Sequence, residues 1–170
     1  MKRLARLLLL LGGLLGMAAS SAFAASSVSL ANLALPTVVY SHSSQLSNGT
    51  MTLTATSDAA TGFSVTIVAS NFAYSGLYGG SPIPAANFSI TLAGVPVVTT
   101  GQAVDPTGGP RVPTTNAAGE LDVARKTIQA NAGFGVGTYT QALAVTLLIP
   151  GQTRAGTYTS TLTTTISAAP

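Results

Sequence analysis

Much of the chain alternates apolar and polar residues with a period of two. The pattern is clear in MTLTAT (51–56), GFSVTIVAS (62–70), NFSITLAG (87–94), TYTQALAVTLLIP (138–150) and TYTSTLTTTIS (157–167). Such alternation predicts β-strands with one face toward a core and one toward water. Threonine suits the wet face because it is both β-branched and polar. The positions predicted to face the core are Met51, Leu53, Ala55, Phe63, Val65, Ile67, Ala69, Phe88, Ile90, Leu92, Tyr139, Leu143, Val145, Leu147, Ile149, Tyr158, Leu162 and Ile166.

Turn signals separate these strands, as is typical of a fold made of many short strands. The signals are Asn48-Gly49, Ser57-Asp58, Gly79-Gly80 and Pro150-Gly151. Further strands are predicted at 26–35, 37–41 and 125–131, and no long helix is expected. The pattern indicates an all-β fold, an antiparallel β-sandwich that is immunoglobulin-like in general architecture.

A short repeat marks the last two strands. GTYT occurs at 137–140 and again at 156–159, and the segment IPGQTRAG joins the two strands. We expect these strands to form a terminal hairpin, with Tyr139 and Tyr158 at matching points near one end of the sandwich.

Residues 101–119 form the one long irregular segment, which is rich in proline and glycine. Long loops in compact domains are either functional or mobile. Because the segment carries no aromatic residue to anchor it, we expect a mobile loop.

The first 24 residues have the features of a cleavable signal peptide. Lys2, Arg3 and Arg6 precede an apolar run, and Ala22-Phe23-Ala24 is a small-residue cleavage site of the A-x-A kind, with cleavage after Ala24. The apolar run is too short for a membrane span, and none of spanning length follows it. We therefore expect a secreted protein whose residues 25–170 form one domain, extracellular or associated with the cell envelope, with no membrane span after cleavage.

Removal of the signal peptide changes the charge of the protein. Seven Lys and Arg less Lys2, Arg3 and Arg6 leaves four, which balance the four Asp and Glu. A neutral chain has no basic patch for phosphates, so no nucleic-acid partner is expected. The chain also has no cysteine, which excludes disulfides and thiolate metal sites.

Residues suited to catalysis are few. His42 is the single histidine and lies in a polar stretch, which favours a solvated loop residue. Glu120 and Asp122 are two apart, so a strand would place both on one face, as in a glycosidase pair or a solvated charged cluster. With Asp105 they have no calcium-loop signature. We expect no enzyme, no cofactor and no metal.

The closing stretch VTLLIPGQTRAGTYTSTLTTTISAAP (145–170) resembles the end of the bacterial WxL domain family, which closes on a Trp-x-Leu motif and a terminal proline. The stretch SDAATGFSVTIVASNFAYSG (57–76) is similar to that family's other signature. The resemblance implies an all-β domain held non-covalently at the cell surface by peptidoglycan.

Both signature tryptophans are absent from this chain. Phe63-Ser64-Val65 stands at the first motif and Thr164-Thr165-Ile166 at the second. Phe63 retains an aromatic ring, and Tyr74 and Tyr78 lie in a glycine-rich stretch. Tyrosines there can stack on sugars or on a protein, or they can cover the end of the sheet. These three residues, Phe63, Tyr74 and Tyr78, are the candidate contacts for a ligand or partner.

Two functions of different kinds remain besides wall binding. The uncharged, threonine-rich strands are compatible with a structural subunit of a surface fibre or layer, because charge is a common guard against edge pairing. An envelope glycosidase using Glu120 and Asp122 is the third. The expected partners are therefore a cell-wall polymer or other surface proteins.

Overall fold

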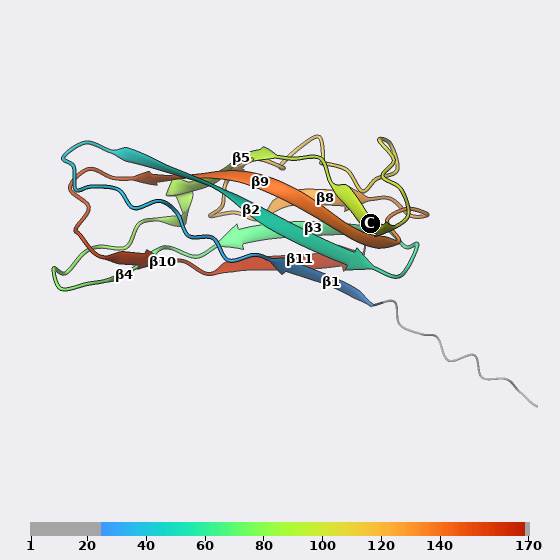
Figure 1. Cartoon of the computed structure of the whole chain (residues 1–170), viewed down its shortest axis with the longest axis horizontal. Helices are drawn as coiled ribbons and strands as arrows, with labels where there is room; N and C mark the ends of the chain where they lie inside the picture. Colours follow the sequence, from blue (N-terminus) through green and yellow to red (C-terminus); the bar gives the residue numbers. More distant parts are fainter. Residues whose placement is uncertain (1–24, 169–170) are drawn as a thin grey trace, which may run out of the picture.

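Two antiparallel sheets face each other in the computed structural model, which describes residues 25–168 (Figure 1). The predicted antiparallel β-sandwich is confirmed. The predicted signal peptide and its cleavage after Ala24 lie outside the described residues.

The strands follow the alternating stretches of the sequence closely. They are β1 (Ser26–Leu30), β2 (Gln45–Ser57), β3 (Phe63–Ala69), β4 (Ala73–Ser75), β5 (Phe88–Ala93), β6 (Val97–Gly101), β7 (Gly119–Glu120), β8 (Arg125–Ala130), β9 (Gly137–Ile149), β10 (Thr157–Thr159) and β11 (Leu162–Ala168). A short 3-10 helix, η1 (Ala85–Asn87), precedes β5.

The larger sheet has the order β1-β2-β9-β5-β7, and β6 also pairs with β9. The opposite sheet has the order β11-β3-β8. The two-stranded ribbon β10-β4 continues it, because β4 follows β3 along the chain and β10 precedes β11. In Figure 1 this ribbon lies at the left end of the molecule.

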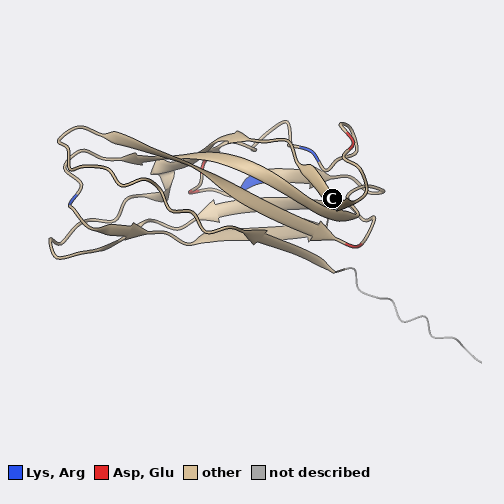
Figure 2. Cartoon of the chain, viewed as in Figure 1, with Lys and Arg blue, Asp and Glu red and all other residues tan. Residues whose placement is uncertain are grey.

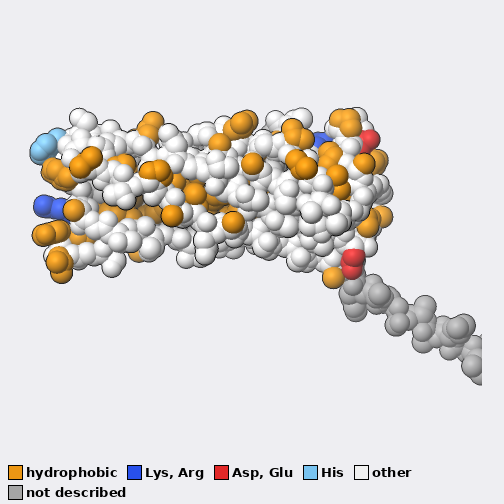
Figure 3. Space-filling view, viewed as in Figure 1, with side chains coloured by type: hydrophobic (Ala, Val, Ile, Leu, Met, Phe, Trp, Pro, Cys, Tyr) orange, Lys and Arg blue, Asp and Glu red, His pale blue; other side chains and the backbone are white. Residues whose placement is uncertain are grey.

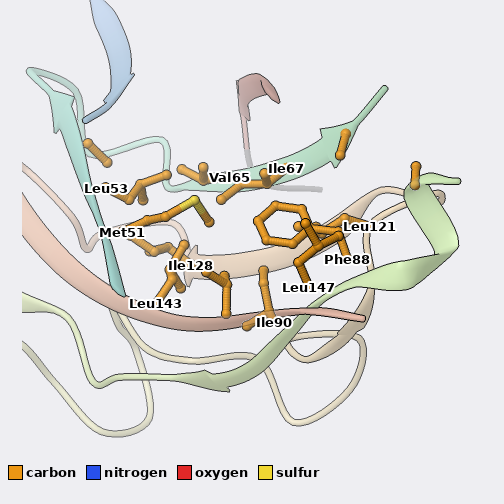
Figure 4. Close-up of a cluster of buried hydrophobic side chains, with 14 of the residues drawn as sticks. Met51, Leu53, Val65, Ile67, Phe88, Ile90, Leu121, Ile128, Leu143 and Leu147 are labelled. Carbon is orange, nitrogen blue, oxygen red and sulfur yellow. The ribbon is translucent and has the colours of Figure 1, made fainter. Parts of the chain in front are cut away.

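The ladder between β2 and β9 is the longest in the molecule. Both strands have 13 residues, and all of them pair, from Gln45 with Ile149 to Ser57 with Gly137. Their inward side chains meet those of β3 and β8 in a core of fully buried apolar residues (Figure 4). Apolar burial of this kind is the dominant favourable term in folding.

Gln141 of β9 is buried in this core and ties three segments together. Its amide nitrogen donates to the backbone oxygens of Gly94, after β5, at 2.9 Å and of Thr127, in β8, at 2.8 Å. Thr127 is free to accept because it is the extra residue of a β-bulge, where the register of β3 against β8 shifts. The tie therefore crosses from one sheet to the other.

The predicted terminal hairpin is wrong. β9 lies in the larger sheet, whereas β10 pairs with β4 and β11 pairs with β3 on the opposite side of the core. Residues 150–156 cross between the sheets instead of turning back within one. Alternation along two successive strands is the same in both arrangements, so the pattern alone does not separate them.

For the same reason, Tyr139 and Tyr158 do not share one end of the sandwich. Tyr139 packs on Phe63 with ring centroids 6.4 Å apart, near the end where β2 finishes. Its hydroxyl hydrogen is shared between the backbone oxygens of Gln102 at 2.9 Å and Val136 at 3.1 Å. Burial raises the pKa of this Tyr139 hydroxyl. Tyr158 pairs with Tyr74 in the ribbon at the opposite end.

Four local predictions also differ from the structure. Asn48-Gly49 is not a turn, since both residues lie within β2. Leu92 is 65% exposed, because the register of β5 shifts between Ile90 and Leu92 and reverses the face. No strand forms at 37–41, and the strand predicted at 26–35 ends at Leu30.

The long segment 101–119 is irregular as predicted, but it is held against β8. Arg111 and Gln129 exchange two backbone hydrogen bonds of 2.9 Å. Gly108 is buried under the ring of Phe134, where a Cβ would overlap the ring. The aromatic anchor therefore comes from outside the segment. Mobility of this segment stays a prediction.

Asp105 stabilises a turn at 105–108 within that segment. Its carboxylate accepts hydrogen bonds from the backbone of Gly108 and from the hydroxyl and backbone of Thr107. These bonds, that from Gly108 first, lower the pKa of Asp105 below its ordinary value. The described residues contain no cluster of His, Cys, Asp and Glu suited to a metal ion.

Charged residues are sparse over the whole sandwich, as Figure 2 shows. Among residues 25–168, no helix is long and apolar enough to cross a membrane.

Replacing Gln141 with methionine tests the cross-sheet tie. Gln141→Met keeps the volume but leaves the carbonyls of Gly94 and Thr127 without their donor, so we expect a loss of about 1–3 kcal/mol in the free energy of unfolding. Urea denaturation measures it. Gln102→Met, which removes two exposed side-chain bonds, one to the backbone oxygen of Gly133 and one from the N–H of Val136, is the matched control. Equal midpoints for the two variants would refute the role of the tie.

Candidate functional site

A groove of about 660 Å³ opens at the end of the sandwich that carries β4 and β10. The volume lies within the range typical of small-molecule and cofactor sites. One wall is the segment 33–41, the other is 153–160, and the floor is the end of the core. Figure 3 shows hydrophobic side chains gathered at this end of the molecule.

The floor of the groove is apolar. Phe72 and Phe88 meet edge to face with ring centroids 5.3 Å apart, and Ile83 and Leu147 lie beside them. All four side chains are buried. A ligand that reaches the floor therefore meets carbon atoms, which favours apolar groups over charged ones.

The first wall depends on a glycine in β2. A Cβ at Gly49 would lie 3.0 Å from the δ-carbons of Leu33 and Leu35, closer than ordinary contact. The missing side chain lets both leucines rest on β2, and the hydroxyl of Ser47 donates to the backbone oxygen of Pro36 at 3.0 Å. A glycine is therefore needed at position 49 of the strand. Its lack of a side chain lets the segment 33–41 pack against β2.

The rim of this wall is exposed and hydrophobic. Val39 is 84% exposed and Tyr40 is 56% exposed. The ring of Tyr40 meets His42 edge to face at 5.3 Å. The adjoining loops are joined where Gln152 donates its N–H to the backbone oxygen of Ser41. An exposed tyrosine beside an open groove is suited to stacking on a ligand.

The second wall is built around two tyrosines of the ribbon. Tyr158 lines the groove and packs on Tyr74, with ring centroids 5.2 Å apart. The hydroxyl of Tyr158 donates to the backbone oxygen of Arg154, and that of Tyr74 donates to Ala155 and accepts from the N–H of Tyr78. These bonds hold the loop after β4 and the loop before β10, which together form the tip of the ribbon.

The polar groups of the groove are almost all uncharged. Burial, followed by the neighbouring Tyr74, raises the pKa of the Tyr158 hydroxyl above its ordinary value. Arg154 is the one charged residue among those that line the groove. The other polar lining residues are Thr37, Ser41, Ser43, Gln45, Ser47, Thr153, Thr157, Thr159 and Ser160. Such a site favours a neutral ligand rich in hydrogen-bonding groups.

The three candidate contact residues do not come together. Tyr78 is 66% exposed at the tip, outside the residues that line the groove. Tyr74 is half-buried and supports the tip through its hydroxyl. Phe63 is 1% exposed and lies in the core at the opposite end, so its proposed role as a contact is wrong. The alternation in GFSVTIVAS already indicated that Phe63 faces inward.

Other residues of the groove were missed for identifiable reasons. Leu33 and Leu35 continue the alternation of β1 without pairing as a strand. The sequence pattern predicts Tyr158 as a core residue and Tyr40 as part of a strand. In the sequence pattern, each of these residues looks like an ordinary core or strand residue. They surround one opening only because the segment 33–41 packs across β2.

The residues considered for catalysis lie apart from the floor of the groove. His42 is exposed, as expected, and does not line the groove. Glu120 and Asp122 are exposed on either side of buried Leu121 and lie outside the groove. The guanidinium of Arg125 donates to the backbone oxygen of Glu120 at 2.7 Å.

The two stretches that resemble the WxL signatures lie side by side. β3 pairs with β11, so Val65 is opposite Ile166 and Ile67 is opposite Thr164. Thr164 is half-buried on the inward face of β11, where it stands at the family's second tryptophan position.

No family model, curated protein or solved structure matches the chain. The groove and the surfaces of the sandwich are therefore the observations from which a function can be inferred.

Removing a single hydroxyl tests how the second wall is held. Tyr74→Phe keeps the ring but loses the bonds to Ala155 and Tyr78, so we expect a loss of about 1 kcal/mol in the free energy of unfolding. Thermal or urea denaturation provides the measurement. The exposed Tyr78→Phe is the control and should change stability by less than about 0.5 kcal/mol. If both variants behave alike, the hydroxyl of Tyr74 does not hold the tip.

Proposed function

We propose that this protein is a non-catalytic component of a bacterial cell envelope that holds the wall polymer in its end groove. The observation that carries the proposal is the groove itself, with its apolar floor, hydroxyl-rich walls and exposed rim at Tyr40. The resemblance to WxL domains and the predicted export support the same conclusion.

The chemistry of peptidoglycan matches that of the groove. Its sugars carry hydroxyl, amide and small methyl groups, and its peptides contain alanine. The floor at Phe72 and Phe88 is suited to the methyl groups, and the serine and threonine walls are suited to the hydroxyl and amide groups. Tyr40 provides an exposed ring on which a sugar can stack.

Cosedimentation with purified peptidoglycan tests this function directly. We expect residues 25–170 to be retained by the polymer, and Tyr40→Ala to weaken retention roughly fivefold to tenfold, as for loss of an aromatic anchor. Tyr78→Ala is the matched control, because Tyr78 is also exposed at this end but does not line the groove.

Two results would count against the proposal. Retention no greater than that of an unrelated neutral protein would exclude wall binding. If Tyr40→Ala and Tyr78→Ala weaken retention equally, or if neither variant weakens it, the binding site does not lie in the groove.

A second candidate function is a structural subunit of a surface fibre or layer. The supporting observation is that β1 and β11, at edges of the two sheets, contain only uncharged residues. We expect such a subunit to scatter more light as its concentration rises, with ordered assemblies visible by electron microscopy. A monomer that persists at high concentration would exclude this function.

A further inference from the structure

The outer edge of β11 is open. β11 pairs with β3 along one side over all 7 of its residues, from Leu162 with Ala69 to Ala168 with Phe63. Within residues 25–168 no strand pairs with its other side, which leaves a row of backbone N–H and C=O groups free. Such a row is a template for a further strand.

Two other edges of the sandwich are protected, whereas β1, at the remaining edge of the larger sheet, is uncharged like β11. At the far edge of the same sheet, β8 exchanges two backbone bonds with Arg111, and it carries the charges of Arg125 and Lys126. β7, at the edge of the larger sheet, has only 2 residues, one of them the charged Glu120. Short strands, charges and covering loops are the usual guards of an edge against another chain.

β11 carries no guard in its own sequence, and β1, which lies near it across the sandwich, does not pair with it. Its sequence LTTTISA contains no charge and no proline, and its register against β3 continues without a bulge. Thr163, Thr165 and Ser167 are exposed on its outer face. An edge that is long, regular and uncharged is predisposed to pair with another strand.

We propose that β11 pairs antiparallel with β11 of a second copy of this chain about a two-fold axis. In the register that we infer, Thr164 lies opposite Thr164 of the second copy, Thr163 opposite Thr165, and Leu162 opposite Ile166. Antiparallel pairing of identical strands about a two-fold axis is self-complementary. The joined sheet has the order β8-β3-β11-β11-β3-β8.

The side chains of β11 make a second copy the favoured occupant. In this register Thr163 meets Thr165 on the wet face and Leu162 meets Ile166 on the inward face, and both are stabilising cross-strand pairs. A slip by one residue would place Thr163 opposite Thr164, which reverses the faces and directs one core toward water. Slips by two residues keep both cores on one side, but only the register centred on Thr164 pairs Leu162 with Ile166 on the inward face.

This contact goes beyond wall binding and does not depend on it. It names the surface by which the second candidate, a fibre or layer subunit, would begin to assemble. The two-fold pairing alone closes into a dimer, so it can be tested where no fibre forms and without peptidoglycan.

Cysteine cross-linking tests the contact, because the chain has no cysteine of its own. Thr163→Cys and Thr165→Cys are prepared separately from residues 25–170, mixed and oxidised. We expect a disulfide-linked dimer chiefly in the mixture, since residues opposite each other come within disulfide reach, whereas like positions are offset by two residues. Thr52→Cys, exposed in the middle of β2, is the control and should stay monomeric.

Each other outcome overturns part of the proposal. No cross-linked dimer in the mixture, or as much dimer with Thr52→Cys, would exclude the β11 contact. Dimers formed as efficiently by Thr163→Cys alone as by the mixture would exclude the register centred on Thr164.

A charge on the edge provides an independent readout. The double variant Thr163→Lys with Thr165→Lys sets lysine opposite lysine twice, so we expect the dimerisation constant measured by analytical ultracentrifugation to fall roughly tenfold or more. Thr50→Lys with Thr52→Lys adds the same charge to the exposed face of β2 and should leave dimerisation unchanged. Equal effects of the two double variants would mean that net charge, not the β11 edge, controls association.

Discussion

The pairing of β2 with β9 is the constraint on which the rest of the structure depends. Since every residue of both strands is paired, the ladder spans the larger sheet from one end of the sandwich to the other. β1 attaches to one side of it, and β5 and β6 attach to the other. The ladder also presents the buried residues of both strands to the opposite sheet, so the position of the core follows from it.

The two halves of this ladder meet different partners. One half faces β3, β8 and β11 across a packed core, and Gln141 ties the two sheets there. The other half faces the short ribbon of β4 and β10, which leaves the groove between it and the segment 33–41. The groove is thus the place where the opposite sheet becomes too narrow to cover the larger one. Gly49 contributes to the groove because its lack of a side chain lets Leu33 and Leu35 of the first wall pack on β2.

Much of the strand content could be predicted from the sequence, because a sheet with one dry face imposes a period of two on its side chains. Met51, Leu53 and Ala55 are buried as that period requires. The prediction was wrong where a local irregularity changed the face, as at Leu92 beyond the bulge in β5. Of the candidate site, Tyr78 was correctly placed at the surface, but Phe63 was not available to a ligand.

By itself, the sequence determined that the chain forms antiparallel strands and that threonine covers much of their wet faces. The reason is that the alternation of apolar and polar residues along a strand follows directly from which of its faces is buried. Only the tertiary structure decided that β9 and β11 lie in opposite sheets, since a turn within a sheet and a crossing between sheets leave the same alternation on both strands. It also decided the groove and the open edge of β11. Both depend on which segments, distant in the sequence, lie beside a strand. The alternation within a strand gives no information about which segments those are.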